Sequence, residues 1–133
     1  MVQKKTEILL VDDDSLILKV LTNYLQDAGY TTTTVLNGKE AWSLLNKDTQ
    51  RFSLMIVDRV MPVLDGIDLL YKVKMSAKLK HIPIIMLTGH AERQEVGVAV
   101  AAGVFDFLYK PIEQELLLFV VKRALDSMEL ISV

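Results

Sequence analysis

The sequence contains no cysteine, and this absence excludes several classes of protein at once. Without a thiol, the chain forms no disulfide, offers no thiolate to a metal ion and has no cysteine nucleophile. Long apolar runs are also missing. The run that follows the basic N-terminus is short, Ile8–Val11, whereas a signal peptide needs a longer one and a membrane span needs about 20 apolar residues. We therefore expect a soluble, cytoplasmic protein with no membrane partner.

An excess of charge of one sign is lacking as well. The chain has 15 lysines and arginines and 17 aspartates and glutamates, for a net charge of −2. Its most basic stretch, residues 72–81, is interpreted as a solvated helix end and loop. No basic run is dense enough to indicate a nucleic-acid surface, so we expect no direct nucleic-acid partner.

What the sequence does contain is enough apolar material for one domain. Its length is 133 residues, of which 51% are hydrophobic, so a real core can be buried. Short apolar runs alternate with segments of helical periodicity. The runs predict strands over Ile8–Val11, Tyr30–Leu36, Phe52–Val57, Ile84–Leu87 and Val104–Tyr109. The periodic segments predict helices over Leu16–Leu25, Lys39–Leu45, Gly66–Met75, Glu92–Ala102 and Glu113–Met128.

This strict alternation predicts an α/β fold with a parallel sheet and helices on both faces. The second strand is rich in threonine and alternates weakly, which favours an edge position. Asp14 or Ser15 can cap the first helix. The apolar stripe of that helix is expected to comprise Leu16, Ile17, Val20, Leu21, Tyr24 and Leu25.

Polar side chains follow four of the five predicted strands. Ligands of an open α/β sheet bind beyond the carboxyl ends of its strands, so these positions are the informative ones. The residues concerned are Asp12, Asp13 and Asp14 after the first strand, Asp58 after the third, Thr88 after the fourth and Lys110 after the fifth. One aspartate after a strand is usually a turn or capping residue. The combination of several such polar residues at one edge is far less probable by chance.

Several acids near one point repel one another and normally need a cation. Carboxylate oxygens without cysteine or a histidine pair select a hard ion, Mg²⁺ or alternatively Mn²⁺. Asp58 can then act as a nucleophile toward a phosphoryl donor. Lys110 would add a positive charge, and the Thr88 hydroxyl would donate to a phosphoryl oxygen.

The string from Asp58 to Gly66, Asp-Arg-Val-Met-Pro-Val-Leu-Asp-Gly, resembles the D-x-x-M-P-x-x-D-G signature of response-regulator receiver domains. Asp12-Asp13, Thr88-Gly89 and Lys110-Pro111 fall where that family has its acidic pair, its threonine and its lysine. The resemblance runs from about residue 7 to 128, and it implies a single receiver domain over residues 1–133. It also implies a doubly wound, flavodoxin-like sheet of five strands in the order 2-1-3-4-5.

The resemblance implies a role for each residue of the site. Asp58 is the phosphoacceptor. It receives its phosphoryl group from a sensor histidine kinase or a phosphotransfer protein of a two-component system. Asp12 and Asp13 hold Mg²⁺ together with Asp58 and the backbone carbonyl of Val60. The domain is a regulatory phosphoacceptor rather than an enzyme, and it assists its own phosphorylation and dephosphorylation.

Two further residues are implied to form the switch. Thr88 moves toward the phosphoryl group, and Phe107, three residues before Lys110, is the switch aromatic. Lys110-Pro111 is expected to be a cis peptide.

Some positions depart from common family patterns. Phe107 has no hydroxyl group, so any rotamer switch depends on packing. The positions that modulate phosphoryl lifetime are Val60 and His90. Val60 cannot orient water by hydrogen bonding, and His90 is either a modulator or a surface residue. Arg59 either shields the acceptor or is simply solvated.

The fourth and fifth helices carry more apolar residues than one buried face needs. Leu116–Val121 is a run of six, and residues 96–102 are almost wholly apolar. Exposed apolar side chains of this kind usually mark an interface. The alternative is that the apolar residues of the two helices are buried against each other. We expect a homodimer or an output contact through the fourth helix, fifth strand and fifth helix.

Three other interpretations stay open at this stage. A flavodoxin-like small-molecule binder needs a Ser/Thr/Gly-rich loop where this chain has three aspartates. A metal-dependent phosphohydrolase commonly has a second acid at the position of Val60. A degenerate receiver would signal by binding alone. Whether the chain acts by itself or within a longer protein is also left open, as are its kinase and output.

Overall fold

The computed structural model describes residues 6–89 and 93–131, in which strands and helices alternate. The strands are β1 (Glu7–Val11), β2 (Thr31–Val35), β3 (Leu54–Asp58), β4 (Ile84–Thr88) and β5 (Asp106–Tyr109). The helices are α1 (Ser15–Asp27), α2 (Gly38–Lys47), α3 (Gly66–Lys74), α4 (Arg93–Ala101) and α5 (Gln114–Ile131). Every predicted element is present, with small shifts at its ends.

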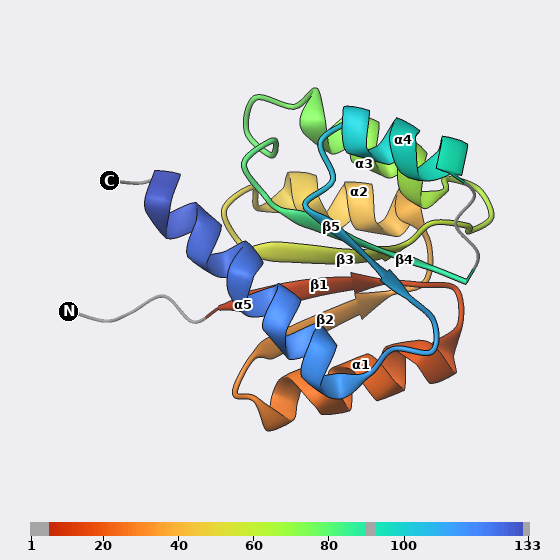
Figure 1. The fold of residues 1–133 in the computed structure, drawn as a ribbon. Coiled ribbons are helices and arrows are strands. Elements are labelled where there is room, and N and C mark those ends of the chain that lie inside the picture. The colour runs from red at the N-terminus through yellow and green to blue at the C-terminus, as the bar shows by residue number, and fades with distance from the viewer. Residues whose placement is uncertain (1–5, 90–92, 132–133) are drawn as a thin grey trace.

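All neighbouring strands pair in parallel, in the order β2-β1-β3-β4-β5. This order confirms the predicted flavodoxin-like sheet, and the threonine-rich β2 is indeed at an edge. Because the strands are parallel, their carboxyl ends meet along one edge of the sheet, at the right of Figure 1. We call this the carboxyl edge and the opposite one the amino edge.

Helices cover both faces of the sheet (Figure 1). Successive side chains of a strand point to opposite faces. In β1, Leu9 and Val11 pack with α2, α3 and α4, whereas Ile8 and Leu10 pack with α1 and α5. β3 and β4 are buried along their whole length, which explains why they form continuous apolar runs in the sequence.

The buried face of α1 differs from the predicted stripe. Its buried residues are Leu18, Leu21 and Leu25, spaced as one face of a helix. Leu16 was expected in the stripe but is 66% exposed. It precedes Leu18 by two residues, about 200° around the helix, and therefore points away from the sheet.

Side-chain caps fix where two helices begin. Asp14 accepts hydrogen bonds from the backbone N–H groups of Leu16 and Ile17, at 2.9 and 3.4 Å, so its predicted capping role is confirmed. Asn37 caps α2 by accepting from the N–H of Glu40 at 2.9 Å.

The start of α2 touches the loop after β3. A Cβ atom at Gly38 would lie 2.4 Å from the carbonyl oxygen of Leu64, a distance that no side chain tolerates. Glycine therefore lets α2 support the loop that follows Asp58. No helix in the described part of the chain has the length and apolar character needed to cross a membrane.

Candidate functional site

Three polar side chains are buried at the carboxyl edge. Asp12 follows β1, Asp58 ends β3 and Thr88 ends β4, and their exposed fractions are 0%, 7% and 1%. Burial of a carboxylate is costly unless the charge is paired or bound to a metal. Two buried carboxylates on adjacent strands therefore mark this edge as a functional site.

Asp12, Asp13 and Asp58 form one acidic cluster, as the sequence predicts. Their carboxylate oxygens lie within 4.8 Å of one another, with Asp13 on the exposed side. Oδ1 of Asp12 accepts a hydrogen bond from the N–H of Asp14 at 2.9 Å. Oδ2 of Asp12 is buried and, within the described residues, no aligned hydrogen-bond donor satisfies it. An all-oxygen donor set with an under-satisfied buried oxygen fits a hard divalent cation such as Mg²⁺.

Lys110 reaches both buried carboxylates from the end of β5. Its Nζ lies 3.1 Å from Oδ2 of Asp12 and 3.0 Å from Oδ1 of Asp58. The contact with Asp12 is an ion pair without the alignment of a hydrogen bond. Burial alone would lower the pKa of Lys110, but its pairing with Asp58 and Asp12 outweighs burial and raises that pKa. The Lys110–Pro111 peptide is cis, as predicted.

Burial raises the pKa values of both Asp12 and Asp58 above the usual range. For Asp58, the hydrogen bond and charge of Lys110 oppose this rise, while the charge of Asp13 adds to it. For Asp12, the hydrogen bond from the Asp14 backbone opposes the rise, and the charge of Asp58 adds to it. A single ammonium group thus leaves the carboxylates incompletely neutralised, which favours binding of a further cation.

The loop after β3 is held tightly at both ends. The N–H of Arg59 donates to the carbonyl of Leu87, and the N–H of Gly66 donates to the carbonyl of Arg59, both at 2.9 Å. A Cβ at Gly66 would lie 2.3 Å from the carbonyl oxygen of Asp58, so α3 begins directly against the acceptor's backbone. Within this loop Val60 is 59% exposed, and Val63 is 79% exposed with a positive φ of 73°.

Arg59 is the site residue whose position the sequence did not settle. Its side chain is half-buried, and its Nε lies 3.4 Å from Oγ1 of Thr88. It is therefore not a solvated surface cation. No sequence pattern indicates this contact, because it depends on the rotamer of one long side chain.

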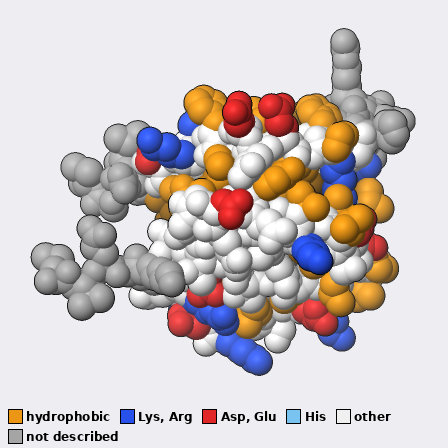
Figure 2. Space-filling model, turned by 90° about the horizontal axis from the view of Figure 1, so that it is seen from below, with side chains coloured by type: hydrophobic (Ala, Val, Ile, Leu, Met, Phe, Trp, Pro, Cys, Tyr) orange, Lys and Arg blue, Asp and Glu red, His pale blue; other side chains and the backbone are white. Residues whose placement is uncertain are grey.

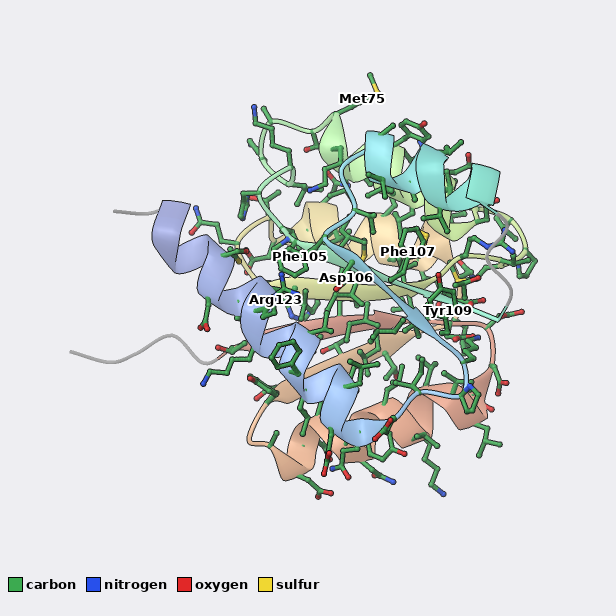
Figure 3. The ribbon with its side chains drawn as sticks, viewed as in Figure 1. Met75, Phe105, Asp106, Phe107, Tyr109 and Arg123 are labelled. Carbon is green, nitrogen blue, oxygen red and sulfur yellow. The ribbon has the colours of Figure 1, made fainter. Side chains whose placement is uncertain are left out.

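Phe107 lies on β5 beside Met86 and is half-buried against the α2, α3 and α4 layer. Figure 3 shows it with Asp106 and Tyr109 of β5 and with Phe105, which directly precedes the strand. His90, which the sequence predicts as a modulator of phosphoryl lifetime or a surface residue, lies outside the described residues.

Exposed apolar side chains gather in two other places. One set flanks β5, and we call it the β5 face: Val98, Val100, Tyr109, Leu116 and Phe119. On α5 the guanidinium of Arg123 lies 5.9 Å from the ring centres of both Phe105 and Phe119. The second set, the apolar rim, follows β1, β2 and β3 at the carboxyl edge: Leu16, Leu36, Val60 and Val63.

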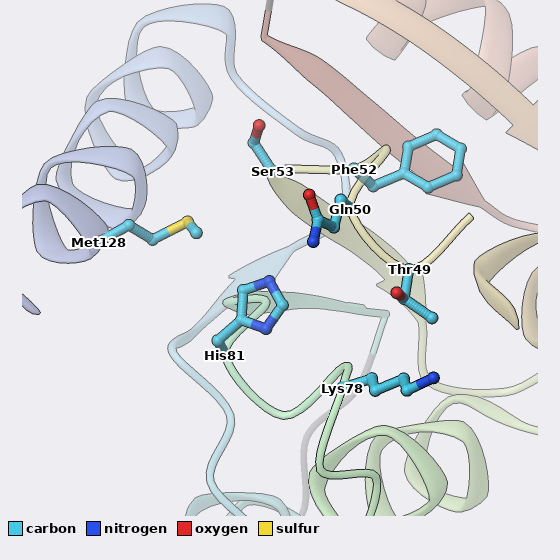
Figure 4. A pocket seen from close by; sticks show the side chains of 7 residues that line it. All are labelled: Thr49, Gln50, Phe52, Ser53, Lys78, His81 and Met128. Carbon is cyan, nitrogen blue, oxygen red and sulfur yellow. The ribbon is translucent and has the colours of Figure 1, made fainter. Parts of the chain in front are cut away.

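A hollow of about 620 Å³ lies at the amino edge, remote from the acidic cluster (Figure 4). It is lined by Thr49, Gln50, Phe52, Ser53, Lys78, His81 and Met128.

On the face seen in Figure 2, acidic and basic side chains are interspersed. The expectation of no nucleic-acid partner stays a prediction.

Comparison with known proteins gives a consistent result. Residues 8–122 match the family model described as the response regulator receiver domain. The chain is 36% identical over 112 residues to the chemotaxis protein CheY of Pseudomonas aeruginosa, covering 84% of this chain and 89% of that protein. It is 37% identical over 124 residues to the 3',5'-cyclic-nucleotide phosphodiesterase regA of Dictyostelium discoideum, which is 92% of this chain but 15% of that protein.

Solved structures agree with these sequence matches. Vibrio cholerae CheY4 superposes with a TM-score of 0.83 at 34% identity, over 90% of this chain and 98% of that one. The signal receiver domain of a signal transduction histidine kinase from Syntrophus aciditrophicus gives 0.83 at 35% identity, over 92% and 91%. The chain spans 15% and 54% of two of its curated relatives, regA and the probable transcriptional regulator ycf29 of Porphyra purpurea.

Proposed function

Because this chain belongs to the response-regulator receiver family, we propose that it is a phosphorylation switch whose acceptor is Asp58. Receiver domains are regulatory phosphoacceptors of two-component signalling. The observation that carries the proposal is the position of Asp58 at the end of β3, within 4.8 Å of the oxygens of Asp12 and Asp13 and 3.0 Å from Lys110. An acid at that point has both a metal-binding pair and a cation beside it.

The chemistry follows from these contacts. A carboxylate oxygen of Asp58 attacks the phosphorus of a phosphohistidine, the P–N bond breaks, and the imidazole nitrogen takes up a proton. Lys110 offsets the charge that develops on the phosphoryl oxygens, and Thr88 donates its hydroxyl hydrogen to one of them. Asp12, Asp13 and Asp58 would hold Mg²⁺, with the backbone carbonyl of Val60 as a further ligand. When bound, the ion neutralises negative charge at the phosphoryl group.

The phosphodonor is proposed to be a sensor histidine kinase or a phosphotransfer protein. The apolar rim supports this partner, because Leu16 and Val63 are 66% and 79% exposed beside a site that a second protein must reach. Exposed apolar side chains around a polar centre are typical of a transient protein interface.

The β5 face is proposed to transmit the signal, by dimerisation or by binding an output partner. Phe107 would couple the site to this face, because it lies on β5, three residues before Lys110. Its packing would change as Thr88 moves, and the β5 face would then dimerise or bind an output partner. If Phe119→Glu and Leu116→Glu leave both oligomeric state and partner binding unchanged, with and without phosphorylation, this part of the proposal is wrong.

We further propose that Val60 and His90 modulate the lifetime of the phosphoryl group and that residues 1–133 form one receiver domain. A cytoplasmic location is proposed because the chain resembles chemotaxis regulators of the CheY type along most of their length.

Mass spectrometry after incubation with acetyl phosphate and Mg²⁺ tests the acceptor. We expect one phosphoryl adduct per chain on the wild type and none on Asp58→Asn. An absent adduct on the wild type, or an equal adduct on the variant, would refute Asp58 as acceptor. Release of many phosphates per chain would instead support the phosphohydrolase alternative.

A further inference from the structure

The outermost strand β2 presents backbone groups to which a further strand can bond. In the described part of the chain, β2 pairs with β1 alone. The N–H of Thr31 and the carbonyl of Val35 bond inward, on the side of β1, both at 3.2 Å. Because residues of a parallel ladder bond to the two sides in alternation, the backbone groups of Thr32 and Thr34 point outward.

This strand lacks the features that usually keep exposed strands apart. Proteins protect such a strand with charged side chains, with proline or with a bulge. The sequence of β2 is Thr-Thr-Thr-Thr-Val, and its register with β1 is continuous. Threonine favours strands, and threonines that face each other across two strands make favourable contacts. β2 is therefore suited to pairing with another strand.

Hollows lie beside β2 on both faces of the sheet, where α1 and α2 flank it (Figure 1). The hollow beside α2 has a volume of about 380 Å³ and the hollow beside α1 about 520 Å³, and both include Val35 and Glu40. Successive side chains of an added strand point to opposite faces, so each hollow would take alternate side chains. We call β2 and these two hollows the β2 edge.

Charges on α2 indicate what binds to the β2 edge. Glu40 and Lys47 both line the hollow beside α2. Glu40 lies level with the carboxyl end of β2, where it accepts from the N–H of Leu36 at 3.0 Å, and Lys47 lies two turns further on, toward the amino end. They are about 10 Å apart along the helix. A two-fold axis at Thr33 would bring Glu40 of each copy opposite Lys47 of the other.

We propose that the β2 edge binds a second copy of this chain: two β2 strands pair antiparallel and join the two sheets into one. Thr32 of each copy exchanges both of its outward backbone hydrogen bonds with Thr34 of the other. The two copies of Thr33 face each other on the axis as a non-hydrogen-bonded pair. The contact is self-complementary, so it closes as a dimer. It involves neither Asp58 nor the β5 face.

Cysteine cross-linking tests this register, because the chain has no cysteine of its own. A disulfide requires Cα atoms about 4.4–6.8 Å apart, and in a non-hydrogen-bonded pair they are about 4.5 Å apart. With diamide as the oxidant, we expect Thr33→Cys to form a covalent dimer at least roughly tenfold faster than Thr31→Cys. Thr31 is the matched control, since it lies on the same face of β2 but more than about 13 Å from its own copy across the axis.

Two further samples make the test specific. Thr31 lies opposite Val35 of the other copy in this register, so a mixture of Thr31→Cys and Val35→Cys should cross-link although neither variant does so alone. Phe119→Glu, on the β5 face, should leave the cross-linking of Thr33→Cys unchanged. If Thr33→Cys does not fold, because its hydroxyl binds Glu7, the mixture decides.

Analytical ultracentrifugation measures the dimer without cross-linking. Glu40→Lys should raise the Kd of the dimer by roughly tenfold, because like charges then meet on both sides of the axis. Glu40→Lys combined with Lys47→Glu should restore most of the affinity, since the opposite charges are only exchanged. Thr34→Pro should prevent dimerisation, because proline removes an N–H that points outward.

The outcomes are distinct. If the wild type stays monomeric up to about 1 mM, or if Thr33→Cys and Thr31→Cys cross-link at equal rates, the inference is wrong. A dimer that Phe119→Glu abolishes forms through the β5 face, which also overturns it. So does a charge exchange that weakens the dimer further than Glu40→Lys alone. None of these results bears on Asp58 as the phosphoacceptor.

Discussion

Lys110 is the cation on which the two buried carboxylates of the site depend. It lies 3.1 Å from Asp12 and 3.0 Å from Asp58, and it is itself 24% exposed. We expect Lys110→Met to destabilise the metal-free protein by about 2 kcal/mol at neutral pH, because two buried like charges then face each other. Urea unfolding followed by circular dichroism measures the change.

The loss should shrink as the pH falls toward about 5. Burial already raises the pKa values of Asp12 and Asp58, and removal of Lys110 raises them further. The folded variant therefore takes up protons before the unfolded chain does, and protonation removes the repulsion. A penalty that stays constant over this range would show that Lys110 stabilises the fold by packing alone.

The sequence predicted that Asp12, Asp13, Asp58 and Lys110 lie at one edge because each of them comes at or just after the end of a strand. Strand order then dictates that these ends meet. The contact of Arg59 with Thr88 was not predictable in this way, since it depends on how a flexible side chain packs between β3 and β4.

At the scale of elements, the loop between β3 and α3 contains a strained residue. Val63 has a φ of 73°, a conformation that β-branched residues rarely adopt, and its side chain is 79% exposed. Val63→Asn should therefore stabilise the protein by about 1 kcal/mol, because asparagine tolerates this region and little packing is lost. Thermal unfolding measures the gain.

Val60→Asn is the control for this change. Val60 is 59% exposed in the same loop, and Val63 is the non-glycine residue with positive φ in the described chain. An equal gain from both variants would indicate a general effect of polarity at this surface and not relief of strain.

Glu7 connects β1 to β2 and to the segment before β3. Its carboxylate binds Nε and Nη2 of Arg51 at 3.1 and 3.0 Å and accepts from the Thr33 hydroxyl. The hydrogen bonds of Arg51 are the main reason why the pKa of Glu7 lies below its usual value. A lowered pKa adds stability above the unfolded-state pKa, and this contribution is lost as the pH falls through the folded-state pKa.

We expect Glu7→Gln to cost about 0.5–1 kcal/mol at neutral pH, a modest figure because the pair is partly exposed. The variant and the wild type should converge in acid, once Glu7 is protonated. Chemical denaturation across this pH range is the measurement, and curves that diverge toward acid would contradict the assignment.

Elements were more predictable than the faces they bury. In β3 and β4 every residue is apolar until the last, so length and burial agree with the sequence. α1 has apolar residues on more than one side, and periodicity alone cannot choose among them. The buried residues Leu18, Leu21 and Leu25 are those that pack with the β1 side chains Ile8 and Leu10.

At the scale of the whole molecule, binding of an ion to the acidic cluster should stabilise the fold. Mg²⁺ at about tenfold above its Kd adds about 1.4 kcal/mol, which corresponds to a rise in Tm of roughly 3–5 °C. Asp13→Asn should abolish most of this rise. Its metal-free Tm should stay near that of the wild type, because Asp13 is exposed. Scanning calorimetry with and without Mg²⁺ tests both statements.

Asp27→Asn is the matched control, since Asp27 is an exposed acid at the end of α1. It should retain the full rise in Tm with Mg²⁺. Loss of the rise in both variants would mean that the ion acts through overall charge and not at the site.

Both ends of the described fold lie at the amino edge, opposite Asp58. β1 begins there at Glu7, and Met128 near the end of α5 lines the hollow that Ser53 and His81 share (Figure 4). A linker, a fluorescent protein or a solid support attached through either end would therefore lie at the amino edge, on the opposite side of the molecule from Asp58. The acceptor would still face free solution, so the molecule is suited to immobilised assays in which kinases are presented to an anchored target.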